Sequence, residues 1–392
     1  MPDVRPARRV LLAGGLGAAA AAALPVPAYA SAAEPVVLRL AGPAGPAPVG
    51  AVELHLVDRS RTDPWTDRPR ELMATVAYPA VDVRDRPLLP WLPPGAERAL
   101  KARYGGALDG YAFPWTHSAD RAPARPGRRP VLLYSPGAAS DRTFNTLVVE
   151  ELVSWGYVVV TVDHPHDSGE VEFPDGRVVL SAGEGAAPRR RSPPRSRCAP
   201  PTCGSCSAHW PFCPAAATPM PSGAGSRAGC ARPWTCRAWA RSATPGAVPR
   251  RRPLMDLDPG VRAGADLDGT VFGPVVGRGL DRPFLLMDTA VHDGLNKDPY
   301  WPEFWRNLRG WRRCLRLADA GHHSFTDLVA LAPQLPPGPP LQVGTIAADR
   351  AVAAVRATVR AFFDIQLRGR PDTGHLLDGA SRRHPEVGYV AG

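Results

Sequence analysis

The chain has 392 residues, of which 44% are hydrophobic, so it can bury a full core as one large α/β domain or two smaller ones. Its formal net charge of +10 would by itself suggest a nucleic-acid or membrane-surface partner. However, residues 185–253 hold twelve of the 47 basic residues and no Asp or Glu, which leaves 35 basic against 37 acidic residues elsewhere. This distribution excludes a basic surface spread over the whole chain, and we expect no nucleic-acid partner.

The first thirty residues have the three parts of a secretory signal peptide. A basic start is followed by an apolar run and by the small-residue cleavage pattern Ala28-Tyr29-Ala30. The Arg8-Arg9 pair before that run resembles a twin-arginine export signal. No later stretch is long and apolar enough to cross a bilayer. We therefore predict a signal peptide over 1–30 and an extracellular protein that begins near Ser31.

Apolar patterns along the rest of the chain predict strands that alternate with helices. Strands are predicted within 51–58, 70–80, 129–142, 157–165, 261–269 and 282–293, and helices within 143–156, 301–314 and 349–369. Gly369 stands where the last helix should end. Such alternation predicts a mostly parallel sheet with helices on both faces, and continuous apolar strands fit burial on both faces.

The segment 301–314 interleaves Trp and Arg. Its helical spacing favours a half-buried helix with solvated arginines over a nucleic-acid or membrane surface. We expect this helix to form one wall of a substrate cleft.

Several ordered stretches resemble the α/β-hydrolase superfamily, and more narrowly the secreted platelet-activating factor acetylhydrolase family of the plasma (isoform II) type with its bacterial esterase relatives. They are "ELMATVAYPA", "PVLLYSPGAASDR", "SWGYVVVTVDHPHDS", "AGADLDGTVFGP" and "GHHSFTDL". The resemblance covers about residues 50–390 and is interrupted at about 185–253. It implies a single α/β-hydrolase domain that cleaves carboxylic esters by Ser-His-Asp chemistry without a cofactor or metal. Polyester- and triglyceride-cleaving lipases and cutinase-like hydrolases share much of this pattern and are the alternative.

Two members of a catalytic triad follow from placement and resemblance. His322 follows an apolar strand on a late loop, where a base can reach a nucleophile, and the family pattern His-x-x-Phe-x-Asp selects it over His323. Asp268 matches the family's triad acid, which orients the histidine. Asp266 is its neighbour without a role, and Asp288, after the next strand, is the acid that other α/β hydrolases would use.

The loop "SPGAAS" matches the family's oxyanion-hole loop. The resemblance implies that the amide of Ala138 is one oxyanion donor. Pro136 replaces the histidine that the family usually has there, which puts the local geometry in question. His164 and His166 could suggest a metal pair, but we interpret them as strand-end packing and surface.

The nucleophile is missing from residues 236–253, "CRAWARSATPGAVPRRRP", where a G-x-S-x-G elbow is expected. The surrounding segment 185–253 also holds six of the seven cysteines. Cys203-x-x-Cys206 with His209 could begin a zinc site, but no second ligand pair has a recognisable spacing. An Arg/Pro/Ser-rich segment could instead be a disordered basic arm.

The interpretation that we favour is translation in a displaced reading frame. With GC-rich codons, a shift by one base lets residues 231–252 become "PALDLPGVGAVGHSGGGTAAAA" and lets 195–220 become an amphipathic helix followed by a loop. The shifted frame thus gives a strand, a nucleophile elbow and a helix in the right order, so local pattern and global fold agree. The serine would be encoded across Thr244 and Pro245. We expect 189–250 to be irregular, and a strand across 234–241 would contradict this interpretation.

The sequence thus predicts a secreted ester hydrolase whose nucleophile is lost from this chain, which makes the chain itself inactive. The alternative from another class is a non-catalytic product with an exposed basic arm. The expected partner is a small-molecule or lipid ester, with transient contact to a lipid surface. The sequence does not determine the acyl preference or the oligomeric state.

Overall fold

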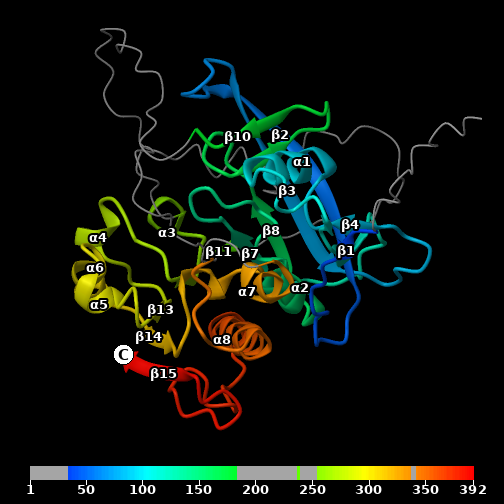
Figure 1. The fold of residues 1–392 in the computed structure, drawn as a ribbon. Helices are drawn as coiled ribbons and strands as arrows, with labels where there is room; N and C mark the ends of the chain where they lie inside the picture. The colour runs from blue at the N-terminus through cyan, green and yellow to red at the C-terminus, as the bar shows by residue number, and fades with distance from the viewer. Residues whose placement is uncertain (1–33, 183–235, 239–253, 337–340) are drawn as a thin grey trace, which may run out of the picture. The chain divides into compact units, whose positions relative to one another are not determined.

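The computed structural model describes residues 34–182, 236–238, 254–336 and 341–392, of which Pro35–Gly392 belong to one compact unit (Figure 1). The predicted signal peptide, Thr244 and Pro245 lie outside the described residues, as does the segment 185–253 apart from residues 236–238.

The described strands are β1 (Val36–Val37), β2 (Val49–Thr62), β3 (Pro69–Pro79), β4 (Leu88–Pro90), β5 (Tyr111–Ala112), β6 (Trp115–Asp120), β7 (Val131–Tyr134), β8 (Val158–Val162), β9 (Glu170–Glu172), β10 (Val178–Leu180), β11 (Cys236–Ala238), β12 (Gly264–Leu267), β13 (Phe284–Thr289), β14 (Arg312–Leu317) and β15 (Val387–Ala391). The described helices are α1 (Pro94–Arg103), α2 (Thr146–Ser154), α3 (Leu254–Leu257), α4 (Val275–Arg278), α5 (Gly294–Lys297), α6 (Trp301–Asn307), α7 (Leu328–Leu331) and α8 (Ala348–Arg368), with 3-10 turns η1 (His322–Phe325) and η2 (Ala332–Gln334). No helix in the described ranges is long and apolar enough to span a membrane.

Two sheets carry the fold. One has the order β11-β7-β8-β3-β2-β6-β4 and the other the order β12-β13-β14-β15. The strands β11, β7 and β8 are parallel to one another, as are β12, β13 and β14, whereas β3 and β15 pair antiparallel with their neighbours. Because β11 also contacts β12, the two sheets meet there. The predicted parallel sheet is therefore present at the centre, and its flanks are mixed.

The strands and two of the helices lie where the apolar patterns predict them. Each predicted strand segment contains a strand, and the segments 143–156 and 349–369 match α2 and α8 to within a residue or a turn. Gly369 follows α8 with a φ of 66°, a left-handed conformation that glycine adopts without a Cβ penalty.

The predicted helix over 301–314 is wrong in its second half. The helix α6 ends at Asn307, and the chain then turns through Gly310, where a Cβ would lie 2.4 Å from the carbonyl oxygen of Asp281. Residues 312–317 instead form β14, which pairs with β13 and buries Cys314 and Leu315. The guanidinium groups of Arg312 and Arg313, which are half-buried, stack on tryptophan rings, so a strand can carry this Trp/Arg composition.

The expected irregularity of 189–250 is also wrong at three residues. Cys236–Ala238 form β11, which pairs in parallel with β7 from Val131 to Leu133. The rest of that segment lies outside the described residues. The central position between β7 and β12 is thus occupied by a strand three residues long.

Alternate side chains of β13 show that helices cover both faces of the four-stranded sheet. Leu285 and Met287 join the core that contains Phe362 of α8. Phe284 and Leu286 join a second core with Phe304 of α6. Figure 1 shows α8 grouped with α2 and α7, which it contacts. The first core also includes strands β7 and β8, so α8 packs on both sheets.

A third apolar cluster, called here the β2–β8 face, lies on the larger sheet. All its members come from β2, β3, β7 and β8, and none comes from a described helix. They are Val52, Leu54, Leu56, Leu72, Ala74, Val76, Tyr78, Val131, Leu133, Val158, Val160 and Val162. Eight of the twelve are only partly buried. In an α/β sheet with parallel central strands, such a face is normally covered by helices.

One buried carboxylate connects α2 to the turn that carries His322. The oxygens of Asp327 accept hydrogen bonds from the indole Nε1 of Trp91 and from the backbone amides of Thr146 and Leu147, each at 2.9 Å. Burial raises the pKa of Asp327 to about 7, although these N–H donors act to lower it. The carboxylate therefore satisfies amides at the first turn of α2 that have no partner within the helix.

We predict that Asp327→Ala lowers the free energy of unfolding by about 2 kcal/mol or more, because the buried N–H groups of Trp91 and Leu147 lose their acceptor at about 1 kcal/mol or more each, whereas the amide of Thr146 keeps the carbonyl of Thr143. Urea titration followed by circular dichroism measures the change. Asp175→Ala is the matched control, since Asp175 is an exposed carboxylate beside Arg177, and it should change stability by less than about 0.5 kcal/mol. Equal effects of the two variants would contradict this role.

Candidate active site

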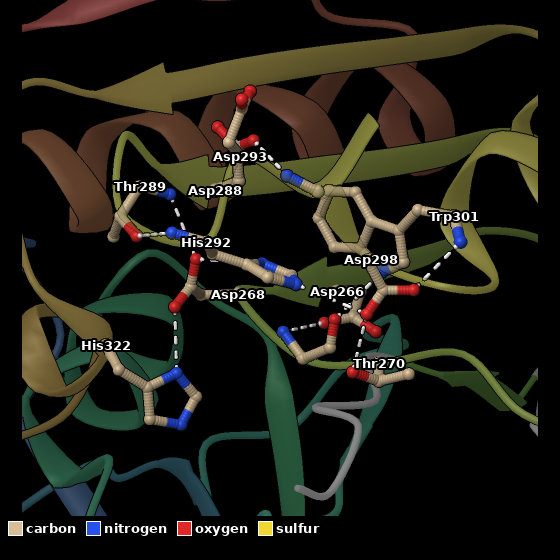
Figure 2. Close-up of polar contacts among 12 residues, drawn as sticks. Asp266, Asp268, Thr270, Asp288, Thr289, His292, Asp293, Asp298, Trp301 and His322 are labelled. Carbon is tan, nitrogen blue, oxygen red and sulfur yellow. Dashed lines mark hydrogen bonds and ion pairs between the residues drawn. The ribbon is translucent and has the colours of Figure 1, made fainter. Parts of the chain in front are cut away.

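Three loops meet where the parallel strands β12, β13 and β14 end. Asp268 directly follows β12, Thr289 is the last residue of β13, and His322 begins η1 a few residues beyond β14. Parallel strands carry their carboxyl ends to the same edge of a sheet, which is where α/β proteins place their sites. Figure 2 shows these residues side by side.

The carboxylate of Asp268 binds His322 on one oxygen. His322 Nδ1 lies 2.8 Å from Oδ2 of Asp268, while the backbone amide of Thr289 donates to Oδ1 at 2.9 Å (Figure 2). Asp268 is 4% exposed, so these bonds are shielded from water. With Nδ1 donating to the carboxylate, Nε2 of neutral His322 carries the lone pair, which is the tautomer of a general base.

A second histidine binds the other oxygen of Asp268. His292 Nδ1 lies 3.2 Å from Oδ1 of Asp268, and its Nε2 lies 3.3 Å from Oδ2 of Asp298. The ring meets the indole of Trp301 edge to face, with centroids 4.9 Å apart. Sequence analysis missed His292. The available signal was its position, since it follows the end of β13 as Asp268 follows β12.

The histidines and carboxylates of this cluster shift each other's protonation. Burial acts to lower the pKa of His292, but hydrogen bonds to Asp268 and Asp298 outweigh it and raise the pKa to about 10. Burial acts to raise the pKa of Asp268, but hydrogen bonds from His292 and His322 outweigh it and lower the pKa to about 2. Near neutral pH, therefore, Asp268 is a carboxylate and His292 an imidazolium.

The alternative acids lie in other contacts. Both oxygens of Asp288 accept from the guanidinium of Arg316, at 3.0 and 2.9 Å, and one also accepts the amide of Gly294. Asp266 accepts the amide of Gly269 at 2.8 Å. The structure thus brings Asp268 to His322 and places Asp288 in a buried ion pair on the same strand edge.

The loop of Ala138 follows β7 in a tight turn. The amide of Ala139, whose φ is 55°, donates to the carbonyl of Asp167 at 2.7 Å, and Ser140 donates to the carbonyl of Gly137. Among the described residues, no backbone carbonyl accepts the amide of Ala138. Since β7 is parallel to β11, this loop and the end of β11 lie at the same edge.

The two histidines of "DHPHD" have separate contacts. Nε2 of His164 lies 2.8 Å from Oγ of Ser135, which connects the end of β8 to the start of the Ala138 loop. His166 stacks on Trp65 with ring centroids 5.7 Å apart. No group of three metal-ligating side chains is present in the part of the chain that the structure describes. The contact of His164 fixes a loop at the strand edge.

We predict that thermal stability falls at both ends of the pH range through this cluster. Stabilisation by ionised Asp268 is present above its unfolded pKa of about 4 and is lost as pH falls toward 2. Stabilisation by charged His292 is present below about pH 6.5 and is lost as pH rises through 10. In His292→Gln the alkaline loss, on the order of 5 °C in Tm, should disappear. Differential scanning calorimetry measures Tm as a function of pH. If Tm of His292→Gln still fell at alkaline pH as in the unchanged chain, His292 would not be the group responsible.

Comparisons with known proteins agree with this arrangement of strands and loops. No protein-family model matches the chain. The chain is 26% identical over 391 residues to a protein of Arthroderma benhamiae described as a probable 1-alkyl-2-acetylglycerophosphocholine esterase, covering 89% of this chain and 92% of that one. The solved structure of a ferulic acid esterase from Streptomyces cinnamoneus matches with a TM-score of 0.68 and 31% identity, over 91% of this chain and 99% of that one. This chain belongs to the α/β-hydrolase family of carboxylic-ester hydrolases, among the esterases similar to platelet-activating factor acetylhydrolase.

Proposed function

We propose that this chain derives from a secreted esterase that cleaves short acyl esters through a serine acyl-enzyme, and that a displaced reading frame over 185–253 has removed its nucleophile. The observation that carries the proposal is the Asp268–His322 pair, with Nδ1 held at 2.8 Å, at the edge where β11 ends and no Gly-x-Ser-x-Gly motif follows in the sequence. A base held in the correct tautomer has chemical use only beside a nucleophile.

The reaction follows from the geometry once a serine stands after β11. Its Oγ attacks the carbonyl carbon of the ester while Nε2 of His322 accepts the hydroxyl proton, and Asp268 stabilises the imidazolium. The amide of Ala138 donates to the oxyanion. The C–O bond to the alcohol then breaks as His322 returns the proton to the leaving oxygen. Water hydrolyses the acyl-enzyme through the same base and regenerates the serine.

The strand β11 counts against the displaced frame, because it lies within 234–241, but it covers only residues 236–238 of that range. One feature of the described residues supports the displaced frame. The β2–β8 face is apolar and receives no described helix, and the shifted reading of 195–220 supplies an amphipathic helix.

The substrate class is a small-molecule or lipid ester of a short acyl group. Export would proceed through the predicted signal peptide. The similarity to an acetylglycerophosphocholine esterase favours an acetyl ester. The similarity to a ferulic acid esterase gives an aromatic acyl ester as the competing substrate. A cutinase-like or lipase activity on longer esters is the remaining alternative, and a comparison of acyl chains separates the three.

We predict that the present chain does not hydrolyse p-nitrophenyl acetate, and that a chain with the frame restored across 185–253, called here the frame-restored chain, does. Replacement of the restored serine by alanine should lower kcat on the order of 10⁶-fold, because the members of a triad act as a unit. Release of p-nitrophenol measures the rate. The rates of hydrolysis of methyl ferulate and of a long-chain ester, compared with that of the acetate, identify the acyl preference.

Turnover by the present chain that survives a serine-directed inhibitor would overturn the proposal, since another nucleophile would then be at work. Sequencing the gene across codons 185–255 is the independent check. A gene in which no shifted frame encodes Gly-x-Ser-x-Gly across these codons would contradict the displaced frame, and the non-catalytic product would then be the better interpretation.

We further predict that Asp268→Asn and Asp288→Asn affect the frame-restored chain differently. Asp268→Asn should lower kcat by about 10⁴-fold, because the amide favours the wrong tautomer of His322. It should also lower Tm, because the ionised carboxylate that stabilises the fold is lost. Asp288→Asn weakens the pair with Arg316, so it should lower Tm and leave kcat of the folded enzyme within about tenfold. Steady-state kinetics and calorimetry on both variants make the comparison, and the reverse pattern would identify Asp288 as the acid.

A further inference from the structure

His292 stands between two carboxylates in a way that determines its charge. Each ring nitrogen faces one carboxylate oxygen, Nδ1 toward Asp268 and Nε2 toward Asp298. A neutral imidazole has one N–H donor and one lone pair, so it can satisfy only one of these contacts. Both contacts are hydrogen bonds only if the ring is an imidazolium. The geometry therefore makes His292 a cation that lies against the acid of the His322 pair.

The partner on the far side, Asp298, is itself held rigidly. Its Oδ1 accepts the amides of Tyr300 and Trp301 at 2.8 and 2.9 Å, and its Oδ2 accepts the hydroxyl of Thr270 at 2.8 Å. Figure 2 shows this chain of contacts from Thr270 through Asp298 and His292 to Asp268. The backbone of His292 is fixed as well, because its amide donates to the hydroxyl of Thr289.

The charged groups around His292 leave Asp268 and Asp298 as the carboxylates that face it. The nearby carboxylates of Asp288 and Asp293 both bind Arg316. On the other oxygen of Asp268 lies His322. The three groups Asp268, His292 and Asp298 together carry one net negative charge, which a proton on His322 would neutralise. Without His292, the two aspartates would carry two net negative charges.

We propose that His292 is a positioning residue for ester hydrolysis, an imidazolium that holds Oδ1 of Asp268 so that Oδ2 stays directed at His322. This inference rests on the proposed function for its kinetic consequence only. Without His292, Oδ1 keeps the amide of Thr289 as its donor, and one hydrogen bond restrains rotation about χ2 less than two. The 2.8 Å contact between Oδ2 and Nδ1 of His322 would then be lost for part of the time. His292 is not placed to touch the substrate, since both its ring nitrogens are used by carboxylates.

The first test uses the present chain. With ¹⁵N-labelled histidine, the signal that disappears in His292→Gln identifies the ring. At about pH 8, where ordinary histidine is neutral, both of its nitrogens should have imidazolium shifts, and Asp298→Asn should move its titration to lower pH. Titration of His292 near the ordinary midpoint of about 6.5 would overturn the proposal.

The second test uses the frame-restored chain and separates positioning from folding. His292→Gln should lower kcat on the order of 10²-fold with KM unchanged, because a displaced catalytic group slows the chemical step and leaves binding intact. His375→Gln is the matched control, since Nδ1 of His375 binds Asp378 at 2.8 Å on an exposed surface, and it should leave both constants unchanged. A kcat for His292→Gln equal to that of the control would overturn the positioning role.

The two tests fail separately. If the frame-restored chain shows no esterase activity, the proposed function fails, whereas the ¹⁵N titration still decides whether His292 is held as an imidazolium. If His292→Gln unfolds, Asp298→Asn in the frame-restored chain replaces it in the kinetic test. That variant keeps His292 on Asp268 with one carboxylate fewer, so it should lower kcat and leave KM unchanged. An unchanged kcat would count against the proposal.

Discussion

The parallel register of β12, β13 and β14 is the constraint on which the site depends. Gly264 lies opposite Phe284, which lies opposite Arg312, so the three strands run in step to the same edge. Asp268 and His322 are 54 residues apart in the chain, yet they meet because each leaves its strand at that edge. Any change of register by one residue would turn the inward side chains outward and separate the pair.

A single core holds the two described halves of the domain together. Side chains of β7 and β8 share it with those of β13 and β14, and α8 packs across both groups through residues such as Val355 and Phe363. Asp327 adds a polar connection between the His322 turn and α2. These contacts use none of the residues 183–235 and 239–253. The base and acid of the triad are therefore positioned by contacts that a displaced frame in that segment leaves intact.

The strands with continuous apolar runs were predictable from sequence because their signals are local, since a run such as 157–165 is bounded by turn residues. Asp268 and His322 were selected instead by their match to the family's pattern, because Asp266, Asp288 and His323 stand in similar places. β14 was not predictable in this way, because Arg312 and Arg313 give it the composition of a solvated helix. Its strand conformation comes from pairing with β13, which sequence spacing does not encode.

His292 and Asp298 escaped sequence analysis for a related reason. A histidine six residues before an aspartate has no spacing that indicates contact, and the ring reaches Asp268 only because β12 and β13 pair in parallel. The three-residue β11 was unexpected because its composition has no strand signal. In each case the deciding interaction comes from a neighbouring strand and has no trace in the local pattern.

The backbone of Asp268 restricts what evolution can place at this position. Its φ of 58° lies in the left-handed region, which Asp and Asn tolerate because their short polar side chains bond locally, and which longer or β-branched residues avoid. Glutamate would adopt this left-handed backbone conformation less readily, and its carboxylate would lie one methylene further from the backbone. Most single replacements would therefore strain the fold as well as remove the charge. In a lineage that no longer needs the acid, asparagine and glycine are the replacements that this backbone tolerates best, so they are the residues to expect here once the reaction has been lost.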